Sequence, residues 1–295
     1  MSEPRRGQLV LVATPIGNLG DLSPRARDVL ESADLICCED TRRTRALLSA
    51  VGIPAGGPGG NRLLSLHGDN EDARVGRVAA ALADGETVAV VSDAGTPGIS
   101  DPGARLVAAL AAAGETVSTV PGPSSVLGAL VVSGLPSDRF AVEGFLPRKG
   151  TARRHRIAAL LADERTTVVL EAPNRVGATL AELAATEPER RVAVVRELTK
   201  VYEEVWRGTL ADAAEEFAPR AVRGEVVLVV EGAPAPEPAD DAGVDAAVRA
   251  ALAEDPAAGP RQVADRVAAA LGVPRRRAYE AALRLRDASA SSGGT

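Results

Sequence analysis

Short apolar runs alternate with amphipathic stretches along the first 125 residues, and each run stops at a polar loop. The amphipathic stretches have helical spacing, with a start signal at Ser23-Pro24 and a stop signal at Gly52. Alternating strands and helices predict a parallel sheet, in which the loops after the strands share one edge. We therefore expect most of the chemistry at that edge. The strands are expected at residues 9–13, 35–38, 63–66, 88–91 and 116–120.

The loop after the fourth expected strand has the most unusual sequence of the five. It follows the apolar run 87–91 and reads Ser-Asp-Ala-Gly-Thr-Pro-Gly-Ile-Ser-Asp-Pro-Gly over residues 92–103. A helix is expected at 101–113. Loops of this kind, between a parallel strand and a helix, are where α/β proteins bind ligands. The sequence therefore predicts a ligand site around this loop.

The second part of the chain does not keep the regular alternation of strands and helices. The strands expected at 191–198 and 203–207 are separated by only Thr199 to Tyr202, which is too short for a parallel crossover and predicts an antiparallel hairpin. The sheet of this part should therefore be mixed. Its other strands are expected at 140–146, 166–171 and 225–231, and its helices at about 151–163, 174–186 and 209–219.

We predict a fold of two α/β domains followed by a small helical bundle. The Pro-Ala repeats after Gly232 read as an extended linker, and the last segments have the helix, glycine turn and helix of a helix-turn-helix-like motif. The bundle helices are expected at 244–253, 260–271 and 274–286. The expected divisions are an N-terminal parallel-sheet domain at 1–122, a second domain with a mixed sheet at 123–232, a linker at 233–240, the helical domain at 241–288 and a disordered tail at 289–295.

Composition is that of a globular protein, with 45% hydrophobic and 25% charged residues in 295. The start of the chain is polar and no apolar run approaches about 18 residues, so we expect a cytoplasmic protein without a membrane partner. The net charge of −6 argues against broad coating of nucleic acid, but it leaves local basic patches able to bind RNA.

Cysteine and histidine usage disfavours metal and triad chemistry. Cys37 and Cys38 are adjacent on an expected buried strand, which favours core packing. The only histidines, His67 and His155, lie in different expected domains, so we expect no metal site and no Ser-His-Asp triad. No Gly-x-Gly-x-x-Gly follows the first strand, which disfavours a dinucleotide or classical methyltransferase Rossmann site. The sequence also has no Walker loop, which disfavours a P-loop nucleotide site.

Six separated motifs occur along the chain in this order: Pro15-Ile16-Gly17-Asn18, Glu39-Asp40-Thr41-Arg42, residues 92–103, Pro121-Gly122-Pro123-Ser124, Gly144-Phe145-Leu146-Pro147-Arg148-Lys149 and Arg196-Glu197-Leu198-Thr199-Lys200. Together they closely resemble the ribosomal small-subunit methyltransferase I family of the tetrapyrrole (corrin/porphyrin) methylase superfamily. The resemblance covers roughly residues 8 to 232. Two segments depart from it: Leu66-His67-Gly68-Asp69-Asn70 stands where members tend to have Tyr-His-Glu-His-Asn, and Glu171-Ala172-Pro173-Asn174-Arg175 where they tend to have Glu-Ser-Pro-His-Arg.

The resemblance implies an activity, a cofactor and partners. It implies transfer of a methyl group from S-adenosylmethionine to the 2'-hydroxyl of a cytidine in 16S ribosomal RNA of the small ribosomal subunit, by a homodimer. It also implies that the cofactor is lined by Pro15, Ala94, Gly95, Thr96, Ile99, Ser124, Ser125, Glu171 and Leu198.

A ribose hydroxyl is a poor nucleophile, so some group must take its proton. Lys149 and Lys200 are the only lysines among 34 basic residues, which favours an ammonium with a lowered pKa at those positions. For Glu39, Asp40 and Arg42 the alternative is a carboxylate–guanidinium cluster that fixes the loop. The candidates, left open at this point, are Lys200, Lys149, Asp101, Glu39, Asp40 and Arg42.

Two basic clusters are expected to contact RNA phosphates, with plain solvated surface as the alternative. The first is Arg148, Arg153, Arg154 and Arg156, beside the expected cleft between the two α/β domains. The second is Arg275, Arg276 and Arg277, at the start of the last helix. Two other functions stay open: a tetrapyrrole or diphthine-type methylase on the same fold, and a non-catalytic RNA-binding regulator that reads RNA with its last bundle.

Overall fold

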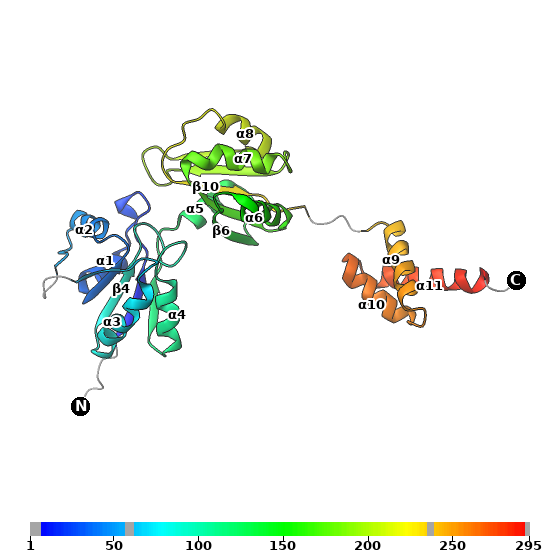
Figure 1. The fold of residues 1–295 in the computed structure, drawn as a ribbon, viewed down its shortest axis with the longest axis horizontal. Coiled ribbons are helices and arrows are strands. Elements are labelled where there is room, and N and C mark those ends of the chain that lie inside the picture. The colour runs from blue at the N-terminus through cyan, green and yellow to red at the C-terminus, as the bar shows by residue number, and fades with distance from the viewer. Residues whose placement is uncertain (1–6, 57–61, 235–238, 293–295) are drawn as a thin grey trace. The chain divides into compact units, whose positions relative to one another are not determined.

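The computed structural model describes residues 7–56, 62–234 and 239–292, with side chains as far as 286. The chain divides into two compact units, Met1–Ala233 and Pro234–Thr295 (Figure 1). Among the described residues, no helix is long and apolar enough to span a membrane.

The first sheet is parallel throughout, as the alternation of strands and helices predicts. Its strand order is β3-β2-β4-β1-β5, so β1 lies between β4 and β5, with Leu9 opposite Val88 and Val117. All five predicted strands are confirmed to within one residue at each end. The strands are β1 (Gln8–Val12), β2 (Leu35–Cys38), β3 (Leu63–Ser65), β4 (Thr87–Val91) and β5 (Val117–Val120).

Helices cover both faces of the first sheet (Figure 1). Helices α1 (Pro24–Ser32) and α2 (Thr41–Ala50) pack on one face, and α3 (Glu71–Ala83) and α4 (Ala104–Ala112) on the other. A short 3₁₀ turn, η1 (Leu19–Asp21), follows β1. Helix α4 begins three residues later than expected, because Gly103 adopts a φ of 120°, and Asp101 therefore stays in the loop.

The two cysteines confirm the prediction of core packing. Successive side chains of a strand point to opposite faces, so Cys38 packs under α1 and α2 and Cys37 under α3 and α4. Both are fully buried. Burial, with a smaller contribution from Cys38, raises the pKa of Cys37 to about 12, which keeps that thiol neutral.

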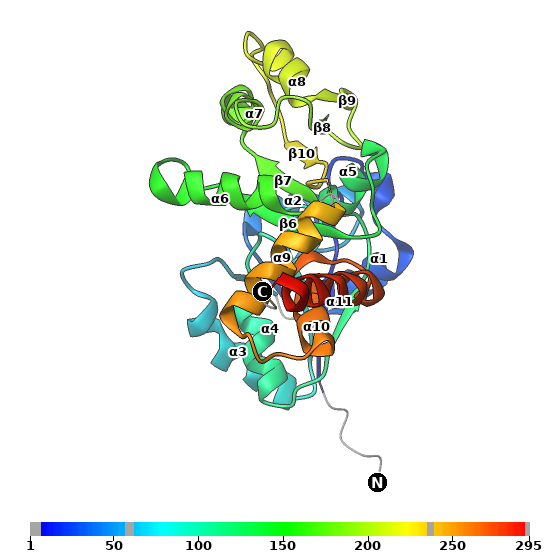
Figure 2. The same cartoon turned by 90° about the vertical axis from the view of Figure 1, so that its right-hand side faces the viewer.

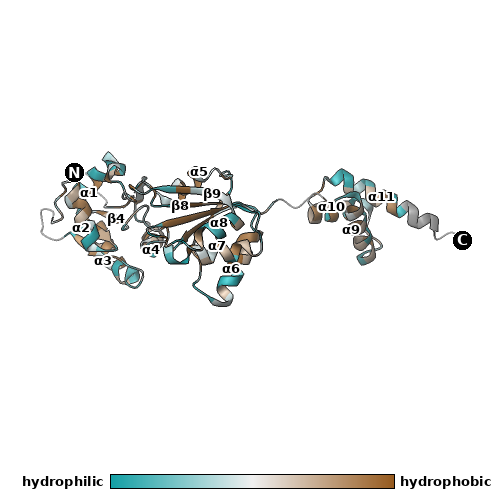
Figure 3. Cartoon of the chain, turned by 90° about the horizontal axis from the view of Figure 1, so that it is seen from above, coloured by the Kyte–Doolittle hydropathy of each residue, from teal (hydrophilic) through white to brown (hydrophobic). Residues whose placement is uncertain are grey.

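The second sheet is mixed, as predicted, with the order β6-β7-β10-β8-β9. Strands β6 and β7 are parallel, the other pairs are antiparallel, and β8 and β9 form the expected hairpin. The apolar strands of this sheet stand out in brown in Figure 3. The strands are β6 (Phe140–Phe145), β7 (Thr166–Glu171), β8 (Arg191–Arg196), β9 (Glu204–Thr209) and β10 (Val226–Val230).

Different helices pack on the two faces of the second sheet. Helices α6 (Gly150–Ala162), α7 (Val176–Ala184) and α8 (Leu210–Phe217) pack over Val169, Val194 and Leu228. On the opposite face α5 (Ser125–Ser133) packs over Val168, Ala193 and Val227. A 3₁₀ turn, η2 (Pro173–Arg175), connects β7 to α7. Helix α5 follows β5 of the first sheet but packs on the second, and it thereby joins the two.

The C-terminal unit contains three packed helices (Figure 2). They are α9 (Asp241–Glu254), α10 (Pro260–Leu271) and α11 (Arg275–Ser292). Gly272, with a φ of 63°, ends α10 and makes the turn to α11. Helix α11 extends through residues 289–292 of the expected tail, whereas 293–295 and the linker positions 235–238 lie outside the described residues.

Candidate active site

A cavity of about 470 Å³ opens at the carboxyl edge of the first sheet, where the loops after its strands meet the second sheet. This volume lies in the usual range of small-molecule sites, roughly 300–1,000 Å³. The cavity is lined by Ile16, Glu39, Arg43, Asp93, Ala94, Gly95, Thr96, Ile99, Ser100, Asp101, Ser124, Ser125, Val126, Phe145, Leu170, Glu171, Ala172, Pro173, Gly224, Glu225, Val226 and Val227.

The loop after β4 is fixed against the end of β1. Thr14 and Gly95 exchange two backbone hydrogen bonds, of 2.9 and 3.1 Å, and Gly95 has a φ of 84° that favours glycine. The Thr96 hydroxyl donates to the carbonyl of Pro123 at 3.3 Å, next to the start of α5. These bonds hold Ala94, Gly95 and Thr96 with their backbone along the cavity.

Two residues expected beside the cofactor are placed differently. Ile16, not its neighbour Pro15, contributes to the cavity wall. Leu198 packs against α5, where Gly128 leaves room for its side chain. The other seven residues implied by the resemblance line the cavity.

Glu171 lines the cavity, but its carboxylate is bound within the second sheet and its helices. It accepts hydrogen bonds from the Ala172 amide at 2.9 Å and the Thr179 hydroxyl at 2.6 Å, and Arg175 lies 3.2 Å away. The side chain is fully buried, so these partners compensate its desolvation. Glu171 therefore fixes the turn after β7.

Four carboxylates make the rest of the cavity acidic. Asp93 accepts from the Asp40 amide at 3.1 Å and pairs with Arg43 at 3.2 Å. Burial and the charge of Asp93 raise the pKa of Glu39, while Arg43 opposes the shift. We call this part of the wall, Glu39, Asp93, Asp101 and Glu225, the acidic cluster.

Asp101 has the most perturbed acid–base equilibrium in this cluster. Burial, followed by the charge of Glu39 and smaller effects of Asp93 and Glu225, raises its pKa to about 6. A hydrogen bond with Ser92 opposes the shift. A cation placed among these carboxylates would relieve their mutual repulsion.

Asp40 and Arg42 form the structural cluster that was the alternative to a catalytic role. The Arg42 guanidinium donates to Asp40 at 2.7 and 3.1 Å, and the Arg42 amide donates to the same carboxylate at 2.8 Å, which caps α2. These bonds hold the pKa of Asp40 well below its usual range. Asp40 is therefore a poor proton acceptor, and neither residue lines the cavity.

Lys200 ties the two sheets together. Its ammonium binds Glu197 at 2.9 Å and Glu225 at 3.2 Å. Its stem lies against Gly17 in the loop after β1, where a Cβ atom would collide with Lys200 Cγ. Burial alone lowers the pKa of Lys200, but the two carboxylates outweigh it and leave the pKa raised. The expectation of a lowered pKa at Lys200 is therefore wrong.

Comparison with known proteins decides the family. The family model for tetrapyrrole (corrin/porphyrin) methylases matches residues 8–214. The chain belongs to this family. Among curated relatives, the ribosomal RNA small subunit methyltransferase I of Xylella fastidiosa strain Temecula1 is 51% identical over 79% of this chain and 84% of its own, and that of Mesorhizobium japonicum is 41% identical over 99% and 97%.

Solved structures of methylases share the fold. Diphthine synthase matches with a TM-score of 0.56 and 14% identity, over 77% of this chain and 90% of its own. Uroporphyrin-III C-methyl transferase from Thermus thermophilus, complexed with S-adenyl homocysteine, matches with a TM-score of 0.51 and 23% identity, over 77% and 97%. The two-sheet architecture of this methylase is therefore that of its family.

One residue of the expected RNA strip is buried. Arg153 is 5% exposed, because it lies on the inner face of α6 with Ile157 and Leu160. Its guanidinium binds Glu182 at 2.9 Å. It also donates hydrogen bonds to the Pro147 carbonyl and the Thr179 hydroxyl. The expectation that Arg153 contacts phosphate is wrong, and this arginine instead fixes α6 to α7.

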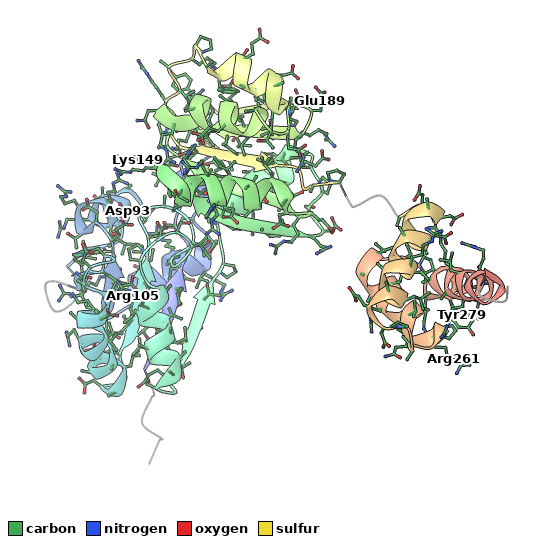
Figure 4. All side chains as sticks on the ribbon, turned by 45° about the vertical axis from the view of Figure 1, so that its right-hand side comes forward. Asp93, Arg105, Lys149, Glu189, Arg261 and Tyr279 are labelled. Atoms are coloured by element: carbon green, nitrogen blue, oxygen red, sulfur yellow. The ribbon has the colours of Figure 1, made fainter. Side chains whose placement is uncertain are left out.

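The other members of the strip lie at the surface. Arg148, Lys149 and Arg154 are exposed at the start of α6, outside the cavity wall, and Arg156 pairs with Glu143 at 2.7 Å. Figure 4 labels Lys149 on the second half of the unit and Asp93 on the first.

Sequence reasoning passed over several cavity residues. Asp93 lies inside the quoted motif 92–103, and Arg43 directly follows the motif Glu39-Asp40-Thr41-Arg42, so motif position could have pointed to both. Glu225 carries no comparable signal. It becomes part of the site only because Lys200 and the Glu197 carboxylate hold the start of β10 there.

A double-mutant cycle tests the contact between Gly17 and Lys200. Gly17→Ala should lower the free energy of unfolding by about 1–3 kcal/mol through overpacking, and by clearly less in a Lys200→Ala background. Urea unfolding followed by Trp206 fluorescence measures this, since Trp206 is the only tryptophan and lies in the second sheet. Gly68→Ala, with open space around it, is the control. Equal costs of Gly17→Ala in both backgrounds would contradict the contact.

Proposed function

We propose that this chain transfers a methyl group from S-adenosylmethionine to the 2'-hydroxyl of a cytidine in 16S ribosomal RNA. The observation that carries the proposal is the acidic cavity at the carboxyl edge of the first sheet, bordered by the loop of Ala94, Gly95 and Thr96. The names of the relatives, at 41–51% identity over most of the chain, support ribosomal RNA as the acceptor. A ribosomal substrate in turn favours the cytoplasm as the place of action.

The cavity fits the cofactor in size, charge and hydrogen-bonding groups. When bound, S-adenosylmethionine supplies an electrophilic methyl group on a positively charged sulfur. The acidic cluster offers carboxylates for that positive charge, and the backbone around Gly95 offers donors and acceptors for the polar groups. The residues proposed to hold it are Ala94, Gly95, Thr96, Ile99, Ser124, Ser125 and Ala172.

The acidic cluster also distinguishes the cofactor from its spent form. The sulfur loses its positive charge when the methyl group leaves, so the attraction of the carboxylates for the ligand weakens at that moment. The cluster therefore favours binding before transfer and release after it. The fixed loops supply the alignment of reacting atoms on which a methyl transfer depends.

RNA is proposed to be held outside the cavity by exposed basic side chains. Arg148, Lys149 and Arg154 at the start of α6 can bind phosphates while a single nucleotide is presented to the cavity. Arg156 is exposed and is proposed as a further contact, although it pairs with Glu143, whose side chain is largely buried. These contacts would position the RNA, and the cavity would select the ribose.

The C-terminal unit is proposed to add affinity for RNA in the small ribosomal subunit. Arg275, Arg276 and Arg277 begin α11 and pair with Asp265, Glu280 and Asp241. Pairs at the surface contribute little stability, roughly 0–1 kcal/mol, so phosphates can replace these carboxylates. The free amide groups of a helix start favour the same anions.

We propose a homodimer as the working form, as the resemblance implies. Helix α5 is apolar along almost its whole length, yet Leu127 and Val131, one turn apart, are 52% and 71% exposed. A second copy of the chain over this face would remove both side chains from water. Light scattering from the full chain would give its mass, and a monomer would refute this part of the proposal.

Gly95→Leu should weaken cofactor binding, because the side chain would occupy part of the cavity. The left-handed backbone costs a leucine roughly 1–2 kcal/mol of stability, so a control with the same strain is needed. Gly114 has a φ of 80°, compared with 84° at Gly95, and open space around it away from the cavity. Calorimetry should give at least a tenfold weaker affinity for S-adenosylmethionine in Gly95→Leu, about 1.4 kcal/mol, and an unchanged one in Gly114→Leu. Equal affinities would refute the placement.

The chemistry of the product tests the acceptor atom. Small ribosomal subunits incubated with the protein and radiolabelled S-adenosylmethionine should gain label in their RNA. Alkaline hydrolysis should then leave the phosphodiester bond after the labelled cytidine intact, since cleavage needs a free 2'-hydroxyl. Label that appears in ordinary mononucleotides would place the methyl group on a base and contradict the proposal.

Replacing Arg275, Arg276 and Arg277 by Ala should weaken RNA binding in a salt-dependent way. The slope of log affinity against log salt should fall in magnitude by about 2 to 3 if all three contact phosphates. Affinity for S-adenosylmethionine should not change. Replacing Arg261, Arg266 and Arg284 of the same unit removes equal charge elsewhere and serves as control. The same loss of slope in both variants would assign the effect to net charge.

A further inference from the structure

Phe145 is an exposed aromatic side chain in the wall of the cavity. The chain has only three phenylalanines, two tyrosines and one tryptophan, yet Phe145 is 59% exposed. By contrast, Trp206 and Phe217 pack edge to face in the core of the second sheet. Among the aromatic residues that the structure describes, Phe145 alone lines the cavity. Leaving a ring in water forgoes the free energy of its burial, so an exposed ring at a cavity is suited to be covered by a ligand.

A β-bulge turns Phe145 toward the cavity. Side chains alternate between the two faces of a strand, so a regular β6 would place Phe145 and Val142 on opposite faces. The pairing of β6 with β7 shifts by one residue between Val142 and Gly144, and Gly144 has a φ of 62° that favours glycine. After the shift Phe145 pairs with Leu170, which also lines the cavity. Bulges recur next to active sites, where they re-aim a side chain.

The chain that follows Phe145 is fixed by two guanidinium groups. Arg175 donates a hydrogen bond to the Leu146 carbonyl at 2.8 Å, and Arg153 donates one to the Pro147 carbonyl at 3.1 Å. Leu146 itself is buried under the helices on the other face of the sheet. The ring of Phe145 is therefore presented on a backbone that is already ordered. A side chain held in this way loses little freedom when a ligand binds.

The charges around Phe145 suit a nucleotide. Arg148 and Lys149 follow it closely in the sequence and are exposed at the start of α6. Four residues of chain span at most about 14 Å, so the ring and these cations can contact the same stretch of RNA. The acidic cluster in the cavity wall repels phosphate, which leaves the ribose and the base to enter beside Phe145. Unpaired bases of RNA are commonly bound by stacking on aromatic side chains.

We propose that the ring of Phe145 stacks on the base of the acceptor nucleotide and thereby places its ribose at the mouth of the cavity. This inference rests on the proposed function and names a residue that contacts the substrate of that same site. Every base has a face that can stack, so stacking tolerates different bases. Phe145 therefore positions the nucleotide, and it does not select cytidine.

Phe140 provides a matched control on the same strand. It lies at the other end of β6, and its partner Thr166 shares a face of β7 with Leu170, the partner of Phe145. Phe140 is 37% exposed, but it does not line the cavity. A nucleotide in the cavity needs Phe145 and not Phe140, whereas a second protein chain that covered the apolar edge strand would bury both.

Kinetics test the stacking contact. Phe145→Ala should lower kcat/KM for methylation of small ribosomal subunits by about 5- to 150-fold, the loss expected when one stacked base loses its aromatic partner. Filter binding of the same subunits should weaken in parallel. Phe140→Ala should keep the wild-type values. Equal losses in the two variants, or no loss in Phe145→Ala, would overturn the inference.

The chemistry of the side chain separates stacking from simple apolar contact. Phe145→Tyr keeps the ring and should retain most of the wild-type kcat/KM. Phe145→Leu keeps an apolar side chain without a ring, and it should lose about as much as Phe145→Ala. A leucine variant as active as the wild type would show that the ring is unnecessary and would contradict stacking.

Two further measurements separate the nucleotide from other occupants. Calorimetry should give the wild-type Kd for S-adenosylmethionine in Phe145→Ala, and light scattering should give the wild-type mass. A cofactor affinity that falls as far as kcat/KM would assign the ring to the cofactor, and a smaller mass would assign it to a subunit contact; either result would overturn the inference. A wild type that methylates no 2'-hydroxyl would refute the proposed function instead, so the two failures are distinguishable.

Discussion

The contact of Lys200 with both sheets is the constraint on which the cavity depends. Its stem needs the missing side chain of Gly17 in the first half, and its ammonium needs the carboxylates of Glu197 and Glu225 in the second. Glu197 in turn fills the space left free by Gly224 and accepts the amide of Glu225 at 3.0 Å. The start of β10 is thereby placed at the cavity, and Glu225 with it.

Glu225 brings one more negative charge to a wall that already holds Glu39, Asp93 and Asp101. An arrangement of this kind costs stability in the free protein, because carboxylates that share a partly buried site repel one another. The protein tolerates the cost where a cationic ligand can offset it. The left-handed φ of 60° at Ser100 adds strain to the same site, which fits the general observation that functional sites break local rules supported by the rest of the fold.

The sequence predicts the sheets well because strands and helices have different periods. Its errors lie where distant segments meet. Lys200 was expected to have a lowered pKa, but its two carboxylate partners raise it. Glu197 is a near neighbour in the sequence, whereas the pairing with Glu225 cannot be read from spacing. Arg153 is different, since its spacing to Ile157 and Leu160 already places it on the inner face of α6. For that residue helical periodicity outweighs the apparent basic strip.

The separation of charge around the cavity has a consequence for how RNA can approach. A polyanion is repelled by the acidic cluster, so phosphates must remain outside the cavity. The exposed basic residues Arg148, Lys149 and Arg154 offer them a place at the start of α6. A nucleotide avoids the repulsion of the acidic cluster and gains the attraction of the basic side chains only in one orientation. In that orientation its phosphates lie on the basic side chains and its ribose faces the carboxylates. In the proposed function, the same distribution that attracts a cationic cofactor also orients the acceptor, although the chain carries a net charge of −6.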